Sequence, residues 1–283
     1  MRRLACALVL TFVSATLVST QPTFSSRVEG VRVDVLVTDG SRKPLRRLTA
    51  ADFSIRDNGV LQQVNAVSFG EISLNVGLAF DLSESVDGDR LDQLRKASQA
   101  LTKQLLAGDQ SSLVTFDQVV SLRCAMSANR SCIDDALGAA TPDGETALID
   151  GVFAGMMVGE SDVGRSLLMV FSDGLDTASW LTADRVLDMG QRSDVVVYPI
   201  AAKGARPEFL DELADLTGGR LHEVDSKSDL SAMFRSILDE FRYRYLVTYT
   251  PTGVVRDGWH KLEVRVNRSG TRVRARPGYQ GEK

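Results

Sequence analysis

Residues 74–80 read LNVGLAF, and residues 81–85, which follow directly, read DLSES. A nearly continuous apolar run of this length is typical of a parallel strand that is buried on both faces of a sheet. Strand-like and helix-like patterns then alternate for roughly 170 residues, as in repeated βαβ units. The sequence therefore predicts an α/β fold with a doubly wound, mostly parallel sheet and helices on both faces.

The other elements of this domain are expected from hydrophobic periodicity. Short apolar runs predict strands at residues 113–116, 167–171 and 195–201. Apolar residues at helical spacing predict helices at residues 87–105, 147–158, 182–191, 207–216 and 228–241.

Both ends of the chain read as short strands. Residues 31–37 alternate with period two, and Asp57-Asn58-Gly59 predicts a hairpin turn whose returning strand is residues 60–69. Near the C-terminus, residues 261–266 are expected to pair with residues 271–275. We expect four segments: a signal peptide at 1–20, a β-rich segment at 21–72, the α/β domain at 73–240, and a C-terminal β segment at 241–283 that packs with the N-terminal one as a small accessory domain.

The N-terminus has the order of a secretory signal peptide. Met1-Arg2-Arg3 is a basic start, Leu4 to Val18 is apolar, and small and polar residues end the run near Thr20. The run is short for a membrane span, although an uncleaved anchor is the alternative. Cys6 precedes most of the apolar run, whereas a lipoprotein cysteine would follow it. We therefore expect an exported protein, periplasmic or extracellular, with no membrane span after signal cleavage.

The net charge of −4 conceals a basic C-terminal segment, because residues 241–283 contain ten Lys or Arg against three Asp or Glu. Basic tails are common in proteins that bind nucleic acid or anionic lipid. The arginines between Arg265 and Arg276, however, mostly alternate with other residues, as on the wet face of a β-ribbon. We interpret them as a solvated face and expect no nucleic-acid partner.

After removal of a signal peptide, Cys124 and Cys132 are the remaining cysteines. In an exported protein, two cysteines at this spacing could close a small loop by a disulfide. Two half-buried thiols, one at a strand end and one at a helix start, are the alternative, because spacing does not show whether the Cβ atoms face each other. Together with His222 and His260, these cysteines give no zinc-ligand spacing.

Oxygen-bearing side chains follow two of the buried strands. Asp81, Ser83 and Ser85 come directly after the first strand, and Asp173 follows the strand at residues 167–171. Thr146 lies in a loop just before a helix. Because the carboxyl ends of parallel strands meet at one edge of a sheet, we expect these three segments to converge there. Carboxylates and hydroxyls without His or Cys are the ligands of a hard cation such as Mg²⁺, Mn²⁺ or Ca²⁺.

At these residues the sequence resembles the metal-ion-dependent adhesion site of von Willebrand factor type A domains. The shared pattern is D-x-S-x-S after the first strand, a later Thr, and S-D-G after the fourth strand. Flanking segments extend the resemblance to von Willebrand factor A-related proteins abundant in Acidobacteria: LTAADF at 48–53, DNG at 57–59, LTGG at 216–219, residues 245–251, and RPGY at 276–279.

The resemblance implies a role for each residue of the site. Asp81, Ser83 and Ser85 would bind the cation directly, with Mg²⁺ the expected ion. Thr146 would bind directly or through water, and Asp173 would act through a water. An open coordination position would then accept an acidic side chain from a protein partner.

Two residues depart from the family pattern. Glu84 stands where a small residue is usual, and Glu145 stands where Gly is common before the Thr. Both could strengthen cation binding and repel an acidic partner, unless their side chains point to solvent, which is the interpretation we favour. Asp87, Asp89 and Asp176 are interpreted as helix-start or loop residues.

Three functions are compatible with the sequence. The first is a non-enzymatic, metal-dependent protein-binding module of the adhesion type. The second is a structural module of an envelope assembly, in which the metal only stabilises the fold. The third is an enzyme such as a metal-dependent hydrolase. A phosphatase is disfavoured because Ser83 stands where haloacid-dehalogenase-like phosphatases have a second Asp, and serine hydrolysis is disfavoured because there is no G-x-S-x-G.

Overall fold

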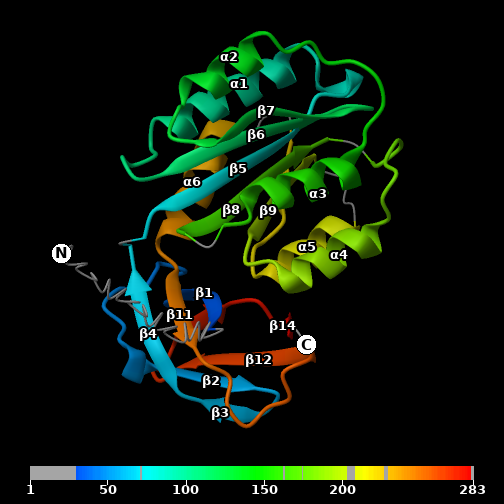
Figure 1. The fold of residues 1–283 in the computed structure, drawn as a ribbon. Helices are drawn as coiled ribbons and strands as arrows, with labels where there is room; N and C mark the ends of the chain where they lie inside the picture. Colours follow the sequence, from blue (N-terminus) through cyan, green and yellow to red (C-terminus); the bar gives the residue numbers. More distant parts are fainter. Residues whose placement is uncertain are drawn as a thin grey trace, which may run out of the picture.

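The computed structural model describes residues 30–70, 72–161, 163–173, 175–202, 208–225 and 229–281, arranged as an α/β domain and a β lobe (Figure 1). The expected signal peptide at residues 1–20, with Cys6, lies outside the described residues. Within the described ranges, every helix falls short of the length and apolarity needed to cross a membrane.

One six-stranded sheet organises the α/β domain, in the order β10-β9-β8-β5-β6-β7. All neighbouring strands are parallel except β6 and β7, which are antiparallel. All eight residues of the central strand β5 are buried, as the apolar run predicts. The mostly parallel sheet is therefore confirmed. Its strands are β5 (Leu74–Asp81), β6 (Gln110–Phe116), β7 (Val120–Ser127), β8 (Arg165–Ser172), β9 (Val196–Ala202) and β10 (His222–Val224).

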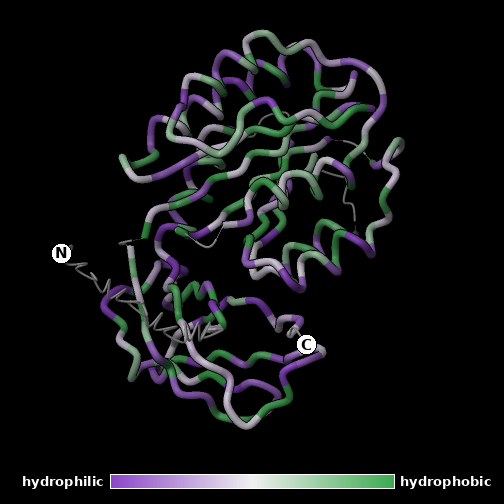
Figure 2. Tube along the Cα trace, viewed as in Figure 1, coloured by the Kyte–Doolittle hydropathy of each residue, from purple (hydrophilic) through white to green (hydrophobic). Residues whose placement is uncertain are grey.

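Helices cover both faces of this sheet, which confirms the predicted layers. Successive residues of β5 alternate between the faces: Leu78 and Phe80 belong to one apolar cluster, and Ala79 to the other. In Figure 2 the strands of this sheet are largely hydrophobic, whereas the helices alternate in hydropathy. One face carries α1 (Asp89–Thr102), α2 (Ser131–Gly138) and α6 (Leu230–Arg242); the other carries α3 (Leu148–Gly159), α4 (Ala183–Arg192) and α5 (Glu208–Thr217).

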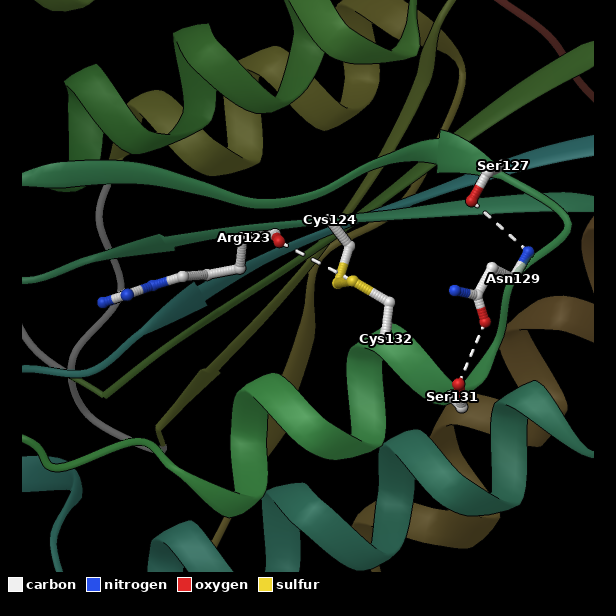
Figure 3. The surroundings of a disulfide bond; sticks show 6 residues. All are labelled: Arg123, Cys124, Ser127, Asn129, Ser131 and Cys132. Carbon is white, nitrogen blue, oxygen red and sulfur yellow. Dashed lines mark hydrogen bonds between the residues drawn. A yellow bond between two sulfur atoms is a disulfide. The ribbon is translucent and has the colours of Figure 1, made fainter.

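A disulfide joins β7 to α2 (Figure 3). The bond connects Cys124 and Cys132, whose Cα atoms are 6.0 Å apart. Cys124 is 3% exposed and belongs to the apolar cluster under α1, α2 and α6. The structure therefore selects the disulfide from the two interpretations that the spacing allows.

The β lobe is built from both ends of the chain, in two four-stranded sheets. The orders are β13-β1-β11-β4 and β14-β12-β2-β3. Strands from the N-terminal and C-terminal segments alternate in the first sheet, whereas in the second the C-terminal pair β14-β12 lies beside the N-terminal pair β2-β3. Their inner faces share one apolar cluster. The strands are β1 (Val31–Thr38), β2 (Phe53–Asp57), β3 (Val60–Gln62), β4 (Val64–Phe69), β11 (Tyr245–Tyr249), β12 (Gly258–Val266), β13 (Arg272–Arg274) and β14 (Gly278–Gly281), with a short 3-10 helix at Ala50–Asp52. A second 3-10 helix, Glu84–Val86, follows β5 in the α/β domain.

Two pairings differ from the sequence-based prediction. The hairpin at Asn58 and Gly59 is confirmed, with φ values of 45° and 82°. Its returning segment, however, divides into β3, which pairs with β2, and β4, which pairs with β11 in the other sheet. The side chain of Gln62 is bonded to the backbone of Thr252 at this division.

The predicted pairing of residues 261–266 with residues 271–275 is wrong. Strand β12 lies between β2 and β14, so both of its edges are occupied. Strand β13 instead pairs with β1, with Val273 opposite Val37. After β12 the chain is held by a bond from the Asn267 N–H to the Asp52 carbonyl (2.8 Å) and then crosses to the other sheet.

Buried arginines connect the two parts of the molecule. Arg165, the first residue of β8, donates to Asp34 of β1 (2.6 Å) and to the Phe241 carbonyl (3.0 Å). Arg244 donates to the Tyr198 hydroxyl at 2.7 Å. Because Arg165 begins β8, the β lobe lies against the amino ends of the parallel strands, opposite their carboxyl ends.

Candidate metal centre

The predicted site residues lie in loops at the carboxyl ends of β5 and β8 and before α3. Asp81 is the last residue of β5, and Asp173 follows Ser172, the last residue of β8. Thr146 stands two residues before α3 begins at Leu148. The neighbouring positions of β5 and β8 in the sheet bring the first two segments together.

Asp81 is the most buried member of the site, with 0% exposure. One carboxylate oxygen, Oδ1, accepts from the Ser83 N–H at 2.9 Å. The other, Oδ2, accepts from the Ser172 hydroxyl at 2.6 Å. Burial raises the pKa of the Asp81 carboxyl above its ordinary value, although the hydrogen bonds from Ser172 and Ser83 oppose the shift; the negative charge of Asp173 adds to it. A cation here would relieve the cost of burying this charge.

A chain of hydroxyls leads from Asp81 to the surface. The Ser83 and Ser85 hydroxyl oxygens are hydrogen bonded at 3.2 Å, and the Ser85 hydroxyl donates to Asp173 Oδ1 at 2.8 Å. Ser83 is 2% exposed, whereas Ser85 is exposed. Four of the five predicted residues are thus linked by direct hydrogen bonds, and the cluster opens to solvent at Ser85.

Backbone hydrogen bonds hold the loop that carries Thr146 beside this cluster. The Glu84 N–H donates to the Gly144 carbonyl (3.2 Å), which holds the Thr146 loop against the loop after β5. The Thr146 N–H donates to the Thr177 hydroxyl (3.0 Å), and the Thr177 N–H donates back to the Thr146 carbonyl (2.9 Å). The structure therefore brings the loop of Thr146 to the site but shows no direct bond from its hydroxyl to the other four residues.

Close packing of α3 fixes the position of this loop. Gly151, in the first turn of α3, lies against Phe116 at the end of β6, and a Cβ built there would be 2.2 Å from the ring. The Ala147 N–H donates to the Asp117 carbonyl at 2.7 Å, just after the same strand. A larger residue at position 151 would push α3, and Thr146 with it, away from the sheet.

The acidic residues around the cluster divide into two kinds. Glu84 and Glu145 are exposed, in agreement with side chains that point to solvent. Asp87 and Asp89 are also exposed, at the start of α1. Asp176 accepts from the Ile149 N–H at 3.1 Å and so serves the first turn of α3, as a loop residue does.

The donor set fits a small, hard cation. It contains two carboxylates and three hydroxyls, and no His or Cys. Throughout the described ranges, no cluster of three or more His, Cys, Asp or Glu side chains is arranged to hold a metal. A site rich in hydroxyls and poor in carboxylates leaves much of the charge of a divalent cation uncompensated.

Sequence reasoning missed two contributions to this site. Ser172 was part of the recognised S-D-G pattern, but its bond to Asp81 was not foreseen; its position directly before Asp173 was the available signal. The contact between α3 and the loop at residues 175–182, which joins β8 to α4, was also not predicted. This contact includes the Trp180 N–H, which donates to Asp150 at 2.9 Å, and short-range periodicity carries no information about such a contact.

No protein-family model matches the chain, and no curated protein matches it either. Among solved structures, proximal thread matrix protein 1 from the mussel byssus aligns with a TM-score of 0.55 and 14% identity, over 65% of this chain and 50% of that chain. A structure of the same protein with a zinc-occupied MIDAS motif gives a TM-score of 0.52, at 14% identity, over 65% and 49%. The SpRpn10 VWA domain gives a TM-score of 0.48, at 14% identity, over 58% and 95%.

The sheet order and the position of the oxygen cluster define an open α/β domain with a candidate site at the carboxyl ends of its strands. The fold is that of a von Willebrand factor A domain. The β lobe stands beside this domain.

Proposed function

We propose that this protein is exported and uses its von Willebrand factor A domain as a non-enzymatic, metal-dependent module for binding a protein partner. The observation that carries the proposal is the hydrogen-bonded cluster of Asp81, Ser83, Ser85 and Asp173 at the carboxyl edge of the sheet. The mussel structure with a zinc-occupied MIDAS motif supports a divalent cation on this fold. The oxygen-only donors favour Mg²⁺, with Mn²⁺ or Ca²⁺ as alternatives.

Each residue has a distinct part in such a site. Asp81 supplies the buried negative charge, and Ser83 and Ser85 supply hydroxyl oxygens toward the surface. Thr146 would add a further hydroxyl, and Asp173 orients Ser85 through their hydrogen bond. A bound cation supplies an electrophilic centre that a partner carboxylate can approach from the exposed side of Ser85.

Within the described residues, the surroundings of the two histidines give no support for serine hydrolysis. His260 is buried in the β lobe with Nδ1 2.7 Å from Asp57. His222 stacks against Tyr198, with ring centroids 6.1 Å apart. In the described part of the chain neither ring is bonded to a serine, so neither forms a nucleophile–base pair.

Partner capture with and without chelator tests the proposal. The immobilised protein is exposed to an envelope extract with Mg²⁺ or with EDTA, alongside the variants Ser85→Ala and Asp89→Ala. Ser85 belongs to the cluster, whereas Asp89 is an exposed carboxylate at the start of α1 and serves as the matched control.

We expect a protein that is retained with Mg²⁺ by the native chain and by Asp89→Ala, and lost with EDTA or with Ser85→Ala. A partner recovered equally under all conditions would contradict metal-dependent binding. If EDTA also lowered the melting temperature, the result would favour the structural envelope module, in which the metal only stabilises the fold.

A further inference from the structure

A basic groove lies between the α/β domain and the β lobe, away from the metal centre. It has a volume of about 630 Å³ and is lined by β1, the turn after it, α6, β13 and Arg220. Four of its lining residues are arginines, and the one carboxylate is Glu240. The arginines are Arg42, Arg220, Arg272 and Arg274.

Two of these arginines have no counter-charge among the described residues. Arg42 and Arg272 are exposed, and within the described ranges neither side chain has an ion-pair or hydrogen-bond partner. The turn that carries Arg42 is nevertheless fixed, because Asp39 Oδ1 accepts from the N–H groups of Ser41 (2.8 Å) and Lys43 (2.9 Å). Arg42 itself has a φ of 64°, a conformation that is costly for a residue with a side chain. The fixed turn thus keeps Arg42 at the groove, where its guanidinium has no partner among the described residues.

The other two arginines are only partly neutralised. Arg220 pairs with Glu240 at 2.8 Å, but its Nε is buried without a hydrogen-bond partner within the described ranges. Arg274 donates to the Gly219 carbonyl at 2.7 Å and pairs with the well-exposed Asp215 at 3.2 Å. Exposed pairs of this kind neutralise little charge. The groove therefore keeps a surplus of positive charge.

The arginines reach the groove from three separate segments of the chain: the turn after β1, strand β13, and the loop between α5 and β10. Guanidinium groups from several directions suit a tetrahedral phosphate, whose oxygens accept hydrogen bonds on all sides, better than a planar carboxylate, which one guanidinium can pair fully. The surplus charge and the size of the groove suit more than one phosphate. We propose that this groove binds a ligand that carries two or more phosphate groups, either free in solution or on a lipid.

The pKa of His222 should respond to a change of charge in the groove. His222 follows Arg220 closely in sequence, and its Nε2 is buried without a partner within the described ranges. Burial, with the positive charges of Arg220 and Arg274, lowers the pKa of His222 to about 4, against the opposing effect of Glu240. A bound polyphosphate would offset those arginine charges and raise the His222 pKa. His260, the other histidine of the chain, lies in the β lobe against Asp57 and serves as an internal reference.

Calorimetric titration with inorganic pyrophosphate tests the proposal. The protein is freed of metal with a chelating resin so that the metal centre does not contribute. The test variant is Arg42→Gln/Arg272→Gln, which removes the two groove arginines that have no ion-pair partner among the described residues. The matched control is Arg265→Gln, an exposed arginine on β12 that does not line the groove.

We expect pyrophosphate to bind the native protein and Arg265→Gln alike, and to bind the double variant at least about tenfold more weakly. The His222 pKa, followed by NMR, should rise with pyrophosphate in the native protein and stay unchanged in the double variant. Vesicles of cardiolipin in phosphatidylcholine form the second arm; binding of these vesicles without binding of pyrophosphate, again lost in the double variant, would identify a lipid-borne phosphate. The proposal is overturned if neither probe binds, if citrate binds as tightly as pyrophosphate, or if Arg265→Gln weakens binding as much as the double variant does.

Discussion

Removing the disulfide should weaken the α/β domain by a calculable amount. Cys124 and Cys132 are eight residues apart, so the bond closes a short loop. For a loop of this length, the chain-entropy relation predicts that removal of the bond lowers the free energy of unfolding by about 2.5 kcal/mol, because the unfolded chain is then less constrained. For a domain of this size that loss corresponds to a fall of about 5–10 °C in the melting temperature. The double variant Cys124→Ala/Cys132→Ala, followed by circular dichroism on heating, measures it.

Two comparisons make this test decisive. Native protein treated with a reductant should melt close to the double variant, because both lack the bond. Peptide mapping after alkylation of the unreduced protein should find neither cysteine labelled. Labelling of both cysteines, or a double variant that melts with the oxidised native protein, would refute the reasoning.

Three further predictions concern packing and charge. Gly151→Ala should lower the free energy of unfolding by about 1–3 kcal/mol in urea titrations, because the added methyl would overlap the ring of Phe116. Asp34→Ala should lower it by about 3–5 kcal/mol, because Arg165 would remain buried without its carboxylate. Because the pKa of Asp81 is raised, the metal-free folded state binds this proton more tightly than the unfolded chain does. The carboxyl group therefore stabilises the fold at pH values below its unfolded pKa. That stabilisation is lost as the pH rises through the folded pKa. In metal-free buffer Asp81→Asn should therefore be more stable than the native protein at pH 7, with the difference shrinking toward pH 4.

The variants Gly151→Ala and Asp34→Ala each have a counterpart that should leave stability nearly unchanged. Gly40→Ala places its methyl in open space, in contrast to position 151. Glu263→Ala removes one partner of an exposed pair with Arg265, in contrast to the buried pair. Losses of equal size in a variant and its counterpart would contradict the packing and charge arguments. A difference between Asp81→Asn and the native protein that grows toward acid pH would contradict the sign of the Asp81 effect.

The α/β domain could be predicted from sequence because its signals are local. The run from Leu74 to Phe80 marks a strand buried on both faces, and its flanking helices show regular apolar spacing. The site could be predicted for the same reason. Residues at the carboxyl ends of neighbouring parallel strands must meet at one edge of the sheet, so Asp81 and Asp173 could be assigned to one cluster from the sequence.

The β lobe was harder to predict because its pairings are not local. The segments containing β12 and β13 are close in sequence and alternate alike, yet each pairs with a strand from the N-terminal segment, β2 or β1. Alternation identifies a strand but not its neighbour. The division at Gln62 was hidden for a similar reason, since it depends on bonds to Thr252 at the far end of the chain.

Calorimetric titration of Mg²⁺, Mn²⁺ and Ca²⁺ into the metal-free protein shows whether the oxygen cluster is a metal site. We expect one cation per chain at the cluster of Asp81, Ser83, Ser85, Thr146 and Asp173, with binding abolished in Asp81→Ala and retained in Asp89→Ala. Binding of none of the three ions, or undiminished binding by a folded Asp81→Ala, would contradict it.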